Sequence, residues 1–219
     1  MKPTCPFNIC NGRKHVPVGD GTWAPCKCLQ AEKRKREYEK AGIPKYMFNM
    51  KWDDWYEKHS NAKPLQNRIN KWSAKVMQGG AKRFACAAGG AGSGKLTLAY
   101  LLVRQCIQSG MTAKVVTLTD LLEDRFAEDD AKKYVMDQAL SVDFLCVRLG
   151  VEEAHKWRAS TLERVHFGRK VEGKPTFYTT RYVAGAFSGA YGDVLASAFW
   201  TPKSDVVVWD VSKGRVIVV

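Results

Sequence analysis

The sequence predicts an α/β domain built on a mostly parallel sheet with helices on both faces. Three observations predict it. From residue 81 onward, short apolar runs alternate with helical stretches, as in repeated βα units. The apolar runs are nearly continuous, which is typical of strands buried on both faces. A glycine-rich loop joins one apolar run to a helical stretch, and such sheets bind ligands where their strands end.

The elements of this domain follow from periodicity and turn residues. The expected strands are 84–88, 113–118, 142–147 and 176–180, followed by a final hairpin of 206–209 and 216–219. The expected helices are 98–108, 131–140 and about 152–167, with a further helix capped by Thr119 or Asp120 that runs past Phe126 to a turn at Asp129 and Asp130.

The glycine-rich loop has the pattern G-x-x-x-x-G-K between a strand and a helix, which is the context of a phosphate-binding loop. The predicted phosphate-binding residues are Gly89, Gly90, Ala91, Gly92, Ser93, Gly94, Lys95, Leu96 and Thr97. Backbone N–H groups and the helix N-terminus would face the phosphates, and Lys95 would reach the terminal ones. Leu96 stands where Ser or Thr normally holds Mg²⁺. ATP or ADP is therefore the expected ligand, and a role for Mg²⁺ is in doubt.

Four of the seven cysteines lie within the first 28 residues: Cys5, Cys10, Cys26 and Cys28. In an intracellular chain such clustering indicates a metal more often than disulfides. Two cysteine pairs on two turns suit tetrahedral Zn²⁺, although C-x4-C and C-x-C are less common spacings than C-x2-C. His15 is an alternative ligand, and four free thiols are the alternative interpretation.

The predicted organisation is a zinc-binding module at 1–30, a basic helix and connector at 31–80, and a phosphate-loop domain at 81–219. The first 80 residues carry +9 of the net charge of +13, which favours an anionic partner such as nucleic acid. A helix is expected over 29–42, ending at Gly42 before the break at Ile43 and Pro44. Its basic run 33–36 would either contact phosphates or form a solvated face.

The connector contains an aromatic group and a second helix. Tyr46, Phe48, Trp52, Trp55 and Tyr56 form the aromatic group. We expect it to pack on the neighbouring domain rather than stack on single-stranded bases. Over 65–77, apolar residues at Leu65, Ile69, Trp72 and Val76 share one helical face, and Gly79 and Gly80 end the helix.

The chain has no apolar run near the ~18 residues that span a membrane, and its N-terminal stretch has no apolar signal core. The expectation is a cytoplasmic protein without a membrane partner.

The motifs in this order resemble the DnaC/DnaI-type replicative helicase loaders of the AAA+ superfamily, to which the IstB-like transposition helpers are close relatives. The cysteine pairs and basic helix look like the loaders' zinc module. Near the connector, residues 42–46 are similar to the family motif GIP-x-x-Y, and residues 52–55 to the family motif F-D-N-F. The loop 89–95 is similar to the family's GPPGTGK, and residues 110–122 to the strand and DLL helix that follow it. Residues 149–150 are similar to the end of the family's DDLG motif, and residues 173–180 to its sensor strand LPTIITTN.

The departures from this family fall on the chemistry of hydrolysis. The resemblance places Val147 and Arg148 where the family has two acidic residues that hold Mg²⁺ and polarise the attacking water. It places Arg181 where the family has its sensor asparagine, and Ala198 where the family has the arginine that reaches the site of a neighbouring subunit. Asp143 begins its strand, and Asp210 reads as a turn residue. Arg148 and Arg181 would either compensate triphosphate charge in place of Mg²⁺ or occupy an empty site with partners such as Glu152 and Glu153.

The resemblance implies a DNA replication protein that binds a DnaB-like replicative helicase and single-stranded DNA, associates with itself or other AAA+ subunits, and has lost hydrolysis. One alternative is an active ATPase loader or transposition helper with a rearranged site that uses Thr97. Another is a non-enzymatic decoy that inhibits a helicase or a loader.

Overall fold

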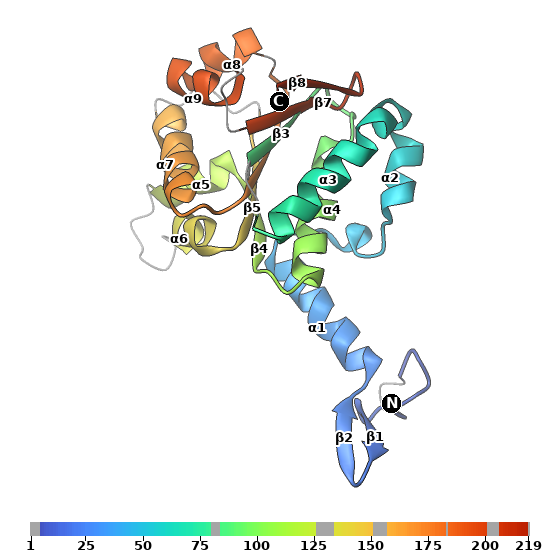
Figure 1. Cartoon of the computed structure of the whole chain (residues 1–219). Helices are drawn as coiled ribbons and strands as arrows, with labels where there is room; N and C mark the ends of the chain where they lie inside the picture. The colour runs from blue at the N-terminus through green and yellow to red at the C-terminus, as the bar shows by residue number, and fades with distance from the viewer. Residues whose placement is uncertain are drawn as a thin grey trace.

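The chain is built around a six-stranded sheet with helices on both faces (Figure 1). The computed structural model describes residues 5–79, 84–125, 134–150, 157–182, 184–200 and 206–218. The sheet has the order β4-β5-β6-β3-β7-β8. Its strands are β3 Phe84–Ala88, β4 Ala113–Thr117, β5 Phe144–Arg148, β6 Thr176–Thr180, β7 Val206–Asp210 and β8 Arg215–Val218. Every pairing is parallel except β7 with β8, so the predicted parallel sheet and final hairpin are confirmed.

Two helical layers cover the sheet (Figure 1). One holds α2 Trp52–Lys58, α3 Gln66–Met77 and α4 Lys95–Gln108, with the 3₁₀ turns Lys45–Met47 and Ser60–Leu65. The other holds α5 Leu118–Arg125, α6 Tyr134–Ser141, α7 Arg158–Val171, α8 Ala184–Tyr191 and α9 Asp193–Trp200. Since side chains alternate along a strand, β3 sends Ala85 and Ala87 into the first core and Phe84, Cys86 and Ala88 into the second.

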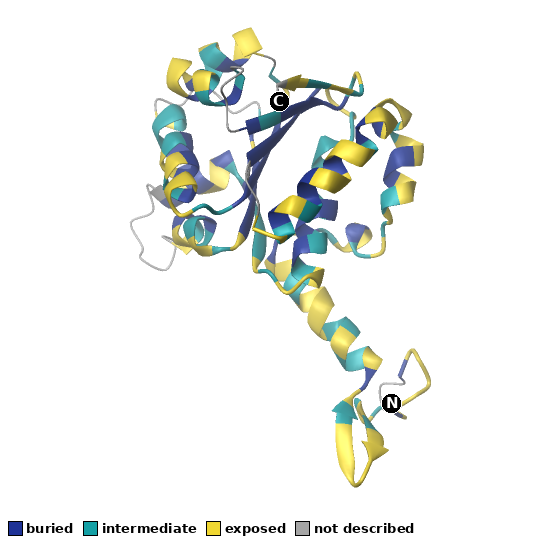
Figure 2. Cartoon of the chain, viewed as in Figure 1, coloured by how far each residue is buried: buried dark blue, intermediate teal, exposed yellow. Residues whose placement is uncertain are grey.

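Trp72 of α3 anchors the first core. Its indole lies 5.6–6.3 Å from the rings of Phe144, Phe177 and Trp209, which come from three different strands. Leu65, Ile69 and Val76 are buried on the same face, so the predicted connector helix is confirmed. The buried strands and exposed outer helix faces are visible in Figure 2.

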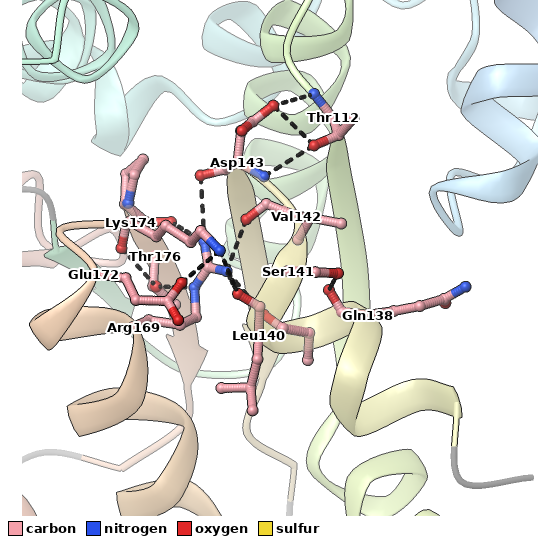
Figure 3. A network of polar contacts seen from close by, with 12 residues as sticks. Thr112, Gln138, Leu140, Ser141, Val142, Asp143, Arg169, Glu172, Lys174 and Thr176 are labelled. Carbon is pink, nitrogen blue, oxygen red and sulfur yellow. Dashed lines mark hydrogen bonds and ion pairs between the residues drawn. The ribbon is translucent and has the colours of Figure 1, made fainter. Parts of the chain in front are cut away.

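The guanidinium of Arg169 holds together the edge of the sheet where β5 and β6 begin (Figure 3). Arg169 is fully buried. It donates to the carbonyl oxygens of Ala139, Leu140, Val142, Asp143 and Pro175 and to the Thr176 hydroxyl, at 2.8–3.3 Å. Burial lowers its pKa to about 10. Asp143 lies at this edge, as expected for a residue that begins a strand, and accepts from Thr112.

The N-terminal residues form an arm that points away from the sheet (Figure 1). A hairpin of β1 His15–Gly19 and β2 Thr22–Pro25 leads into α1 Lys27–Lys40. The helix ends as predicted, because Gly42 adopts a left-handed φ of 79°. The Ala41 carbonyl then accepts the N–H of Val115 on the edge strand β4 at 2.8 Å, which joins the arm to the sheet.

Some predicted elements differ from the structure. The hairpin β1–β2 and the helices α2, α8 and α9 were not predicted. The predicted caps Thr119 and Asp120 are wrong: α5 begins at Leu118, and Thr117 exchanges hydrogen bonds of 2.8–3.0 Å with Asp120 as a capping box.

Parts of five predicted elements fall outside the described residues. They are Gly80 at the end of the connector helix, the extension past Phe126 with the turn at Asp129 and Asp130, the first residues of the helix 131–140, the helix start at Glu152, and Val219 at the end of the last strand. Within the described ranges, none of the helices is both long and apolar enough to cross a membrane.

Candidate nucleotide-binding site and cysteine cluster

The glycine loop lies where the sequence predicts it, between the end of β3 and the start of α4. The Gly89 N–H donates to the carbonyl oxygen of Thr180 at 3.2 Å, which fixes the loop to the end of β6. Gly89, Gly92 and Gly94 have φ values of 151°, 76° and 79°, a region that favours glycine. Gly94 directly precedes the first residue of the helix, Lys95, so the helix N-terminus opens at the loop.

Side chains close around this loop. The Lys95 ammonium donates to the Gly90 carbonyl oxygen at 2.6 Å. The Gly90 N–H in turn donates to the hydroxyl of Ser212, which follows β7, at 3.0 Å. Ser212 is 122 positions from Gly90, so no local pattern in the sequence indicates this contact.

A cavity of about 640 Å³ opens beside the loop. Its lining comes from α2, the glycine loop, α4 and the ends of β5 and β6: Lys58, His59, Ala91, Gly92, Gly94, Lys95, Leu96, Thr97, Arg148, Leu149, Gly150, Thr179 and Arg181. Five of these side chains are basic or imidazole groups, and no carboxylate is among the described lining residues. Such a lining suits an anion.

The strand register explains why the arginines meet the loop. Arg148 is the last residue of β5 and lies opposite Thr179 of β6. Arg181 follows Thr180, which lies opposite Ala88 at the start of the loop. Val147, one residue earlier on β5, points into the core and is fully buried.

The surroundings of Lys95 change the pKa of its ammonium group. Its pKa lies below the ordinary value, first because the ammonium is partly buried and then because Arg181 and Arg148 are close. The three cations therefore repel one another across the cavity. An anion placed between them would relieve that repulsion.

Helix α2 closes the cavity on the side of the connector. The Trp55 indole N–H donates to the Gly94 carbonyl oxygen at 2.9 Å. A Cβ atom on Gly94 would lie 2.4 Å from Cδ2 of His59, so the imidazole packs directly on the loop. The pKa of His59 is lowered by its burial and then by Lys58.

This role of α2 is absent from the sequence predictions, although a signal is present. Trp52, Trp55, Tyr56 and His59 are spaced at i, i+3, i+4 and i+7, the pattern of one helical face. Trp55 and Tyr56 are buried, which confirms that the aromatic group packs on the neighbouring domain. Tyr46 is the exception and is 78% exposed.

The four N-terminal cysteines meet at the end of the arm that is distant from the sheet (Figure 1). Their sulfur atoms all lie within 4.8 Å of one another, with Cys5 to Cys26 at 3.9 Å and Cys10 to Cys28 at 3.5 Å. A tetrahedron with Zn–S bonds of about 2.3 Å has edges of about 3.8 Å, so the spacing fits Zn²⁺. His15 is exposed and is not part of this group among the described residues.

The pKa values of these thiols are shifted in opposite directions, downward by backbone hydrogen bonds at Cys5 and upward by lost hydration and neighbouring sulfur atoms at Cys28. Hydrogen bonds from the backbone of Cys10, Ile9 and Phe7 lower the pKa of Cys5 to about 6. Lost hydration and the neighbouring sulfur of Cys10 raise the pKa of Cys28 to about 12. A bound cation would stabilise the thiolate form of all four cysteines, and so offset the lost hydration that raises the pKa of Cys28.

Comparison with solved structures identifies the fold. DnaI is similar with a TM-score of 0.58 and 16% identity over 71% of this chain and 86% of that chain. A DNA replication initiation factor gives 0.55 and 12%, over 68% of this chain and 46% of that one. The replication initiator DnaA bound to AMPPCP and single-stranded DNA gives 0.51 and 14%, over 63% and 44%. The chain has a DnaI-like AAA+ fold.

Neither a family model nor a curated protein matches this sequence. The chain spans most of the DnaI structure but less than half the length of the other two.

Two other predicted positions, Ala198 and Asp210, are not among the residues that line the 640 Å³ cavity. Ala198 is on α9, partly buried against the second core, and does not line the cavity. Asp210 ends β7 opposite Ala88 and is buried. Its carboxylate accepts the N–H of Lys213 at 3.1 Å and pairs with Arg215 at 3.6 Å. The prediction of a turn residue is therefore wrong, because Asp210 is the last residue of β7 and the turn begins after it.

Proposed function

We propose that this protein acts in DNA replication as a helicase-loader-like factor. It binds a DnaB-like replicative helicase and single-stranded DNA, holds ATP or ADP, and does not hydrolyse it. The observation that carries the proposal is a DnaI-like AAA+ fold whose phosphate cavity presents Arg148, and no described carboxylate, beside Lys95.

The loss of hydrolysis follows from the chemistry of phosphoryl transfer. A working site holds Mg²⁺ through a hydroxyl and an acid and positions a water for attack. In this proposal the hydroxyl position is Leu96 and the acidic positions are Val147 and Arg148. Arg181 replaces the sensor asparagine, and Ala198 replaces the arginine offered to a neighbour. Bound nucleotide would then have a structural role.

The arm supports the binding of a protein partner. The cysteine cluster and hairpin stand at the far end of α1 (Figure 1). Four large apolar side chains on this module are 48–61% exposed: Phe7, Ile9, Val18 and Trp23. Exposed aromatic and aliphatic groups on a small rigid unit are typical anchors of a protein interface. We assign the helicase to this end of the molecule.

A pull-down with a purified DnaB-like helicase tests this assignment. Trp23→Ala and Cys26→Ser are expected to reduce helicase capture at least tenfold, because one removes an anchor and the other opens the cysteine cluster. Tyr46→Ala is the matched control, since this aromatic side chain is 78% exposed but lies on the connector. Equal capture by all variants would contradict the assignment.

Hydrolysis and DNA binding are measured on the same preparation. We expect no ATP hydrolysis above that of Lys95→Ala, and binding of single-stranded oligonucleotides that weakens steeply with salt. Hydrolysis abolished by Lys95→Ala would instead establish an active ATPase. Suppression of an authentic loader's ATPase rate by excess chain would establish the decoy.

A further inference from the structure

Two arginines at the cavity have no partner in the described part of the chain. Arg148 and Arg181 are exposed, and within the described ranges neither guanidinium makes a hydrogen bond or an ion pair. Arg104 and Arg169 differ, because backbone carbonyl oxygens satisfy both of them. The predicted pairing of Arg148 with Glu152 or Glu153 involves residues outside the described ranges.

The fold brings both guanidinium groups to the phosphate loop. Arg148 ends β5, and Arg181 follows the end of β6, the strand between β5 and β3. Both line the 640 Å³ cavity together with Lys95, and Arg181 also lines a neighbouring cavity with Gly89 and Gly90. They therefore flank the glycine loop at the carboxyl ends of β5 and β6.

The charges in this cavity favour a metal-free anion. Arg148, Arg181 and Lys95 line one cavity and carry like charges, so they repel one another. The two arginines add to the effect of burial in lowering the pKa of Lys95. Free ATP carries about four negative charges and relieves this repulsion, whereas Mg²⁺ would add positive charge beside three cations. Leu96 offers no oxygen to a metal. Guanidinium groups match pairs of phosphate oxygens and stay charged.

We propose that the cavity binds the polyphosphate of a nucleotide in its metal-free form, with the guanidinium groups of Arg148 and Arg181 in place of Mg²⁺. The inference rests on the nucleotide binding in the proposed function and names the form that binds. Binding breaks no bond and needs no co-reactant.

Calorimetric titration of the full chain tests this in two buffers. ATP is added in excess EDTA and, separately, in excess Mg²⁺. We expect ATP to bind at least as tightly in EDTA as in Mg²⁺, because Mg²⁺ neutralises two of the negative charges on the phosphates that the arginines would contact. Inorganic tripolyphosphate in EDTA is expected to compete with ATP. Failure to compete would overturn the assignment of the polyphosphate as the contacted group.

Variants that remove the charge of Arg148 or Arg181 test whether these two guanidinium groups contact the nucleotide. Arg148→Gln and Arg181→Gln are each expected to weaken ATP binding in EDTA about tenfold or more, which is the usual effect of losing a charge-assisted hydrogen bond. Arg164→Gln, which changes an exposed arginine on α7, is the matched control and should bind like the unmodified chain. Circular dichroism checks that each variant is folded.

The outcomes separate this inference from the proposed function. Binding of ATP that requires Mg²⁺ would overturn the inference and leave nucleotide binding intact. Full affinity in both glutamine variants would also overturn it. If no nucleotide binds in either buffer, the inference and the nucleotide part of the proposed function fail together, while helicase capture is decided separately.

Discussion

At the scale of single residues, Arg169 shows how one buried cation organises backbone. Its guanidinium satisfies five carbonyl oxygens and one hydroxyl where α6, β5 and β6 meet (Figure 3). A buried carbonyl without a donor costs about 1–3 kcal/mol. The planar fork suits this task better than an ammonium group, since it offers five donors in fixed directions.

We therefore expect Arg169→Met to lower the free energy of unfolding by about 3 kcal/mol or more, measured by urea denaturation. Arg169→Lys should also destabilise the fold, because it keeps the charge and loses most of the bonds. Arg164→Met, on the exposed face of the same helix, is the control and should change stability by less than about 0.5 kcal/mol. A loss below about 1 kcal/mol for Arg169→Met would show that other groups hold this edge.

At the scale of elements, the contact of α2 with the glycine loop links the connector to the cavity. Trp55 bonds to the Gly94 carbonyl oxygen, and the ring of His59 occupies the space where a Cβ on Gly94 would stand. The loop therefore has two separate constraints, its backbone conformation and the position of α2.

Three alanine substitutions in the loop separate these constraints. A Cβ atom on Gly90 would meet no neighbour within 4 Å, and its φ is not left-handed, so Gly90→Ala should be neutral. Gly92 has equal space but a φ of 76°, so Gly92→Ala should cost about 1 kcal/mol from backbone strain. Gly94→Ala adds the clash with His59 and should cost about 2 kcal/mol or more, measured by thermal unfolding.

A double variant completes this test. His59→Ala combined with Gly94→Ala should bring the cost of the alanine back to the level of Gly92→Ala, because the clash is removed and the strain stays. Additive effects of the two changes would contradict direct packing of α2 on the loop.

At the scale of the whole molecule, the arm and the sheet are joined through α1. The cysteine cluster stands at the far end of this helix, and Ala41 bonds to the edge strand β4 at the near end (Figure 1). The module is too small to bury a core, so a metal would supply its folding energy.

We expect the purified chain to contain one Zn²⁺ by elemental analysis. Chelation should expose residues 5–28 to protease while the main unfolding transition stays unchanged, because the sheet has its own cores. Cys28→Ser should lose metal, and His15→Ala should retain it, since His15 is not part of the cluster. A metal-free chain with a protease-resistant arm would contradict the zinc site.

Periodic and local features were predictable from the sequence. The strand 176–180 and the strand before the loop match the structure in both bounds, and the connector helix has the four predicted buried residues. Helices α8 and α9 were missed because each has only eight residues, many of them small, and packing on the second core decides which face is buried. Thr117 was missed as a cap because its strand and the helix follow one another without a break.

What the sequence determined by itself is the order of the strands along the chain, the phosphate loop and the two cysteine pairs, since each depends on neighbours within a few residues. The fold of the arm then brings the two pairs together across 18 and 21 positions. The tertiary structure decided which groups share the cavity. Arg148, Arg181 and His59 reach Lys95 because parallel strands end at one edge of the sheet and because α2 packs across the loop. Such contacts join residues that are distant in the chain, and packing alone selects them.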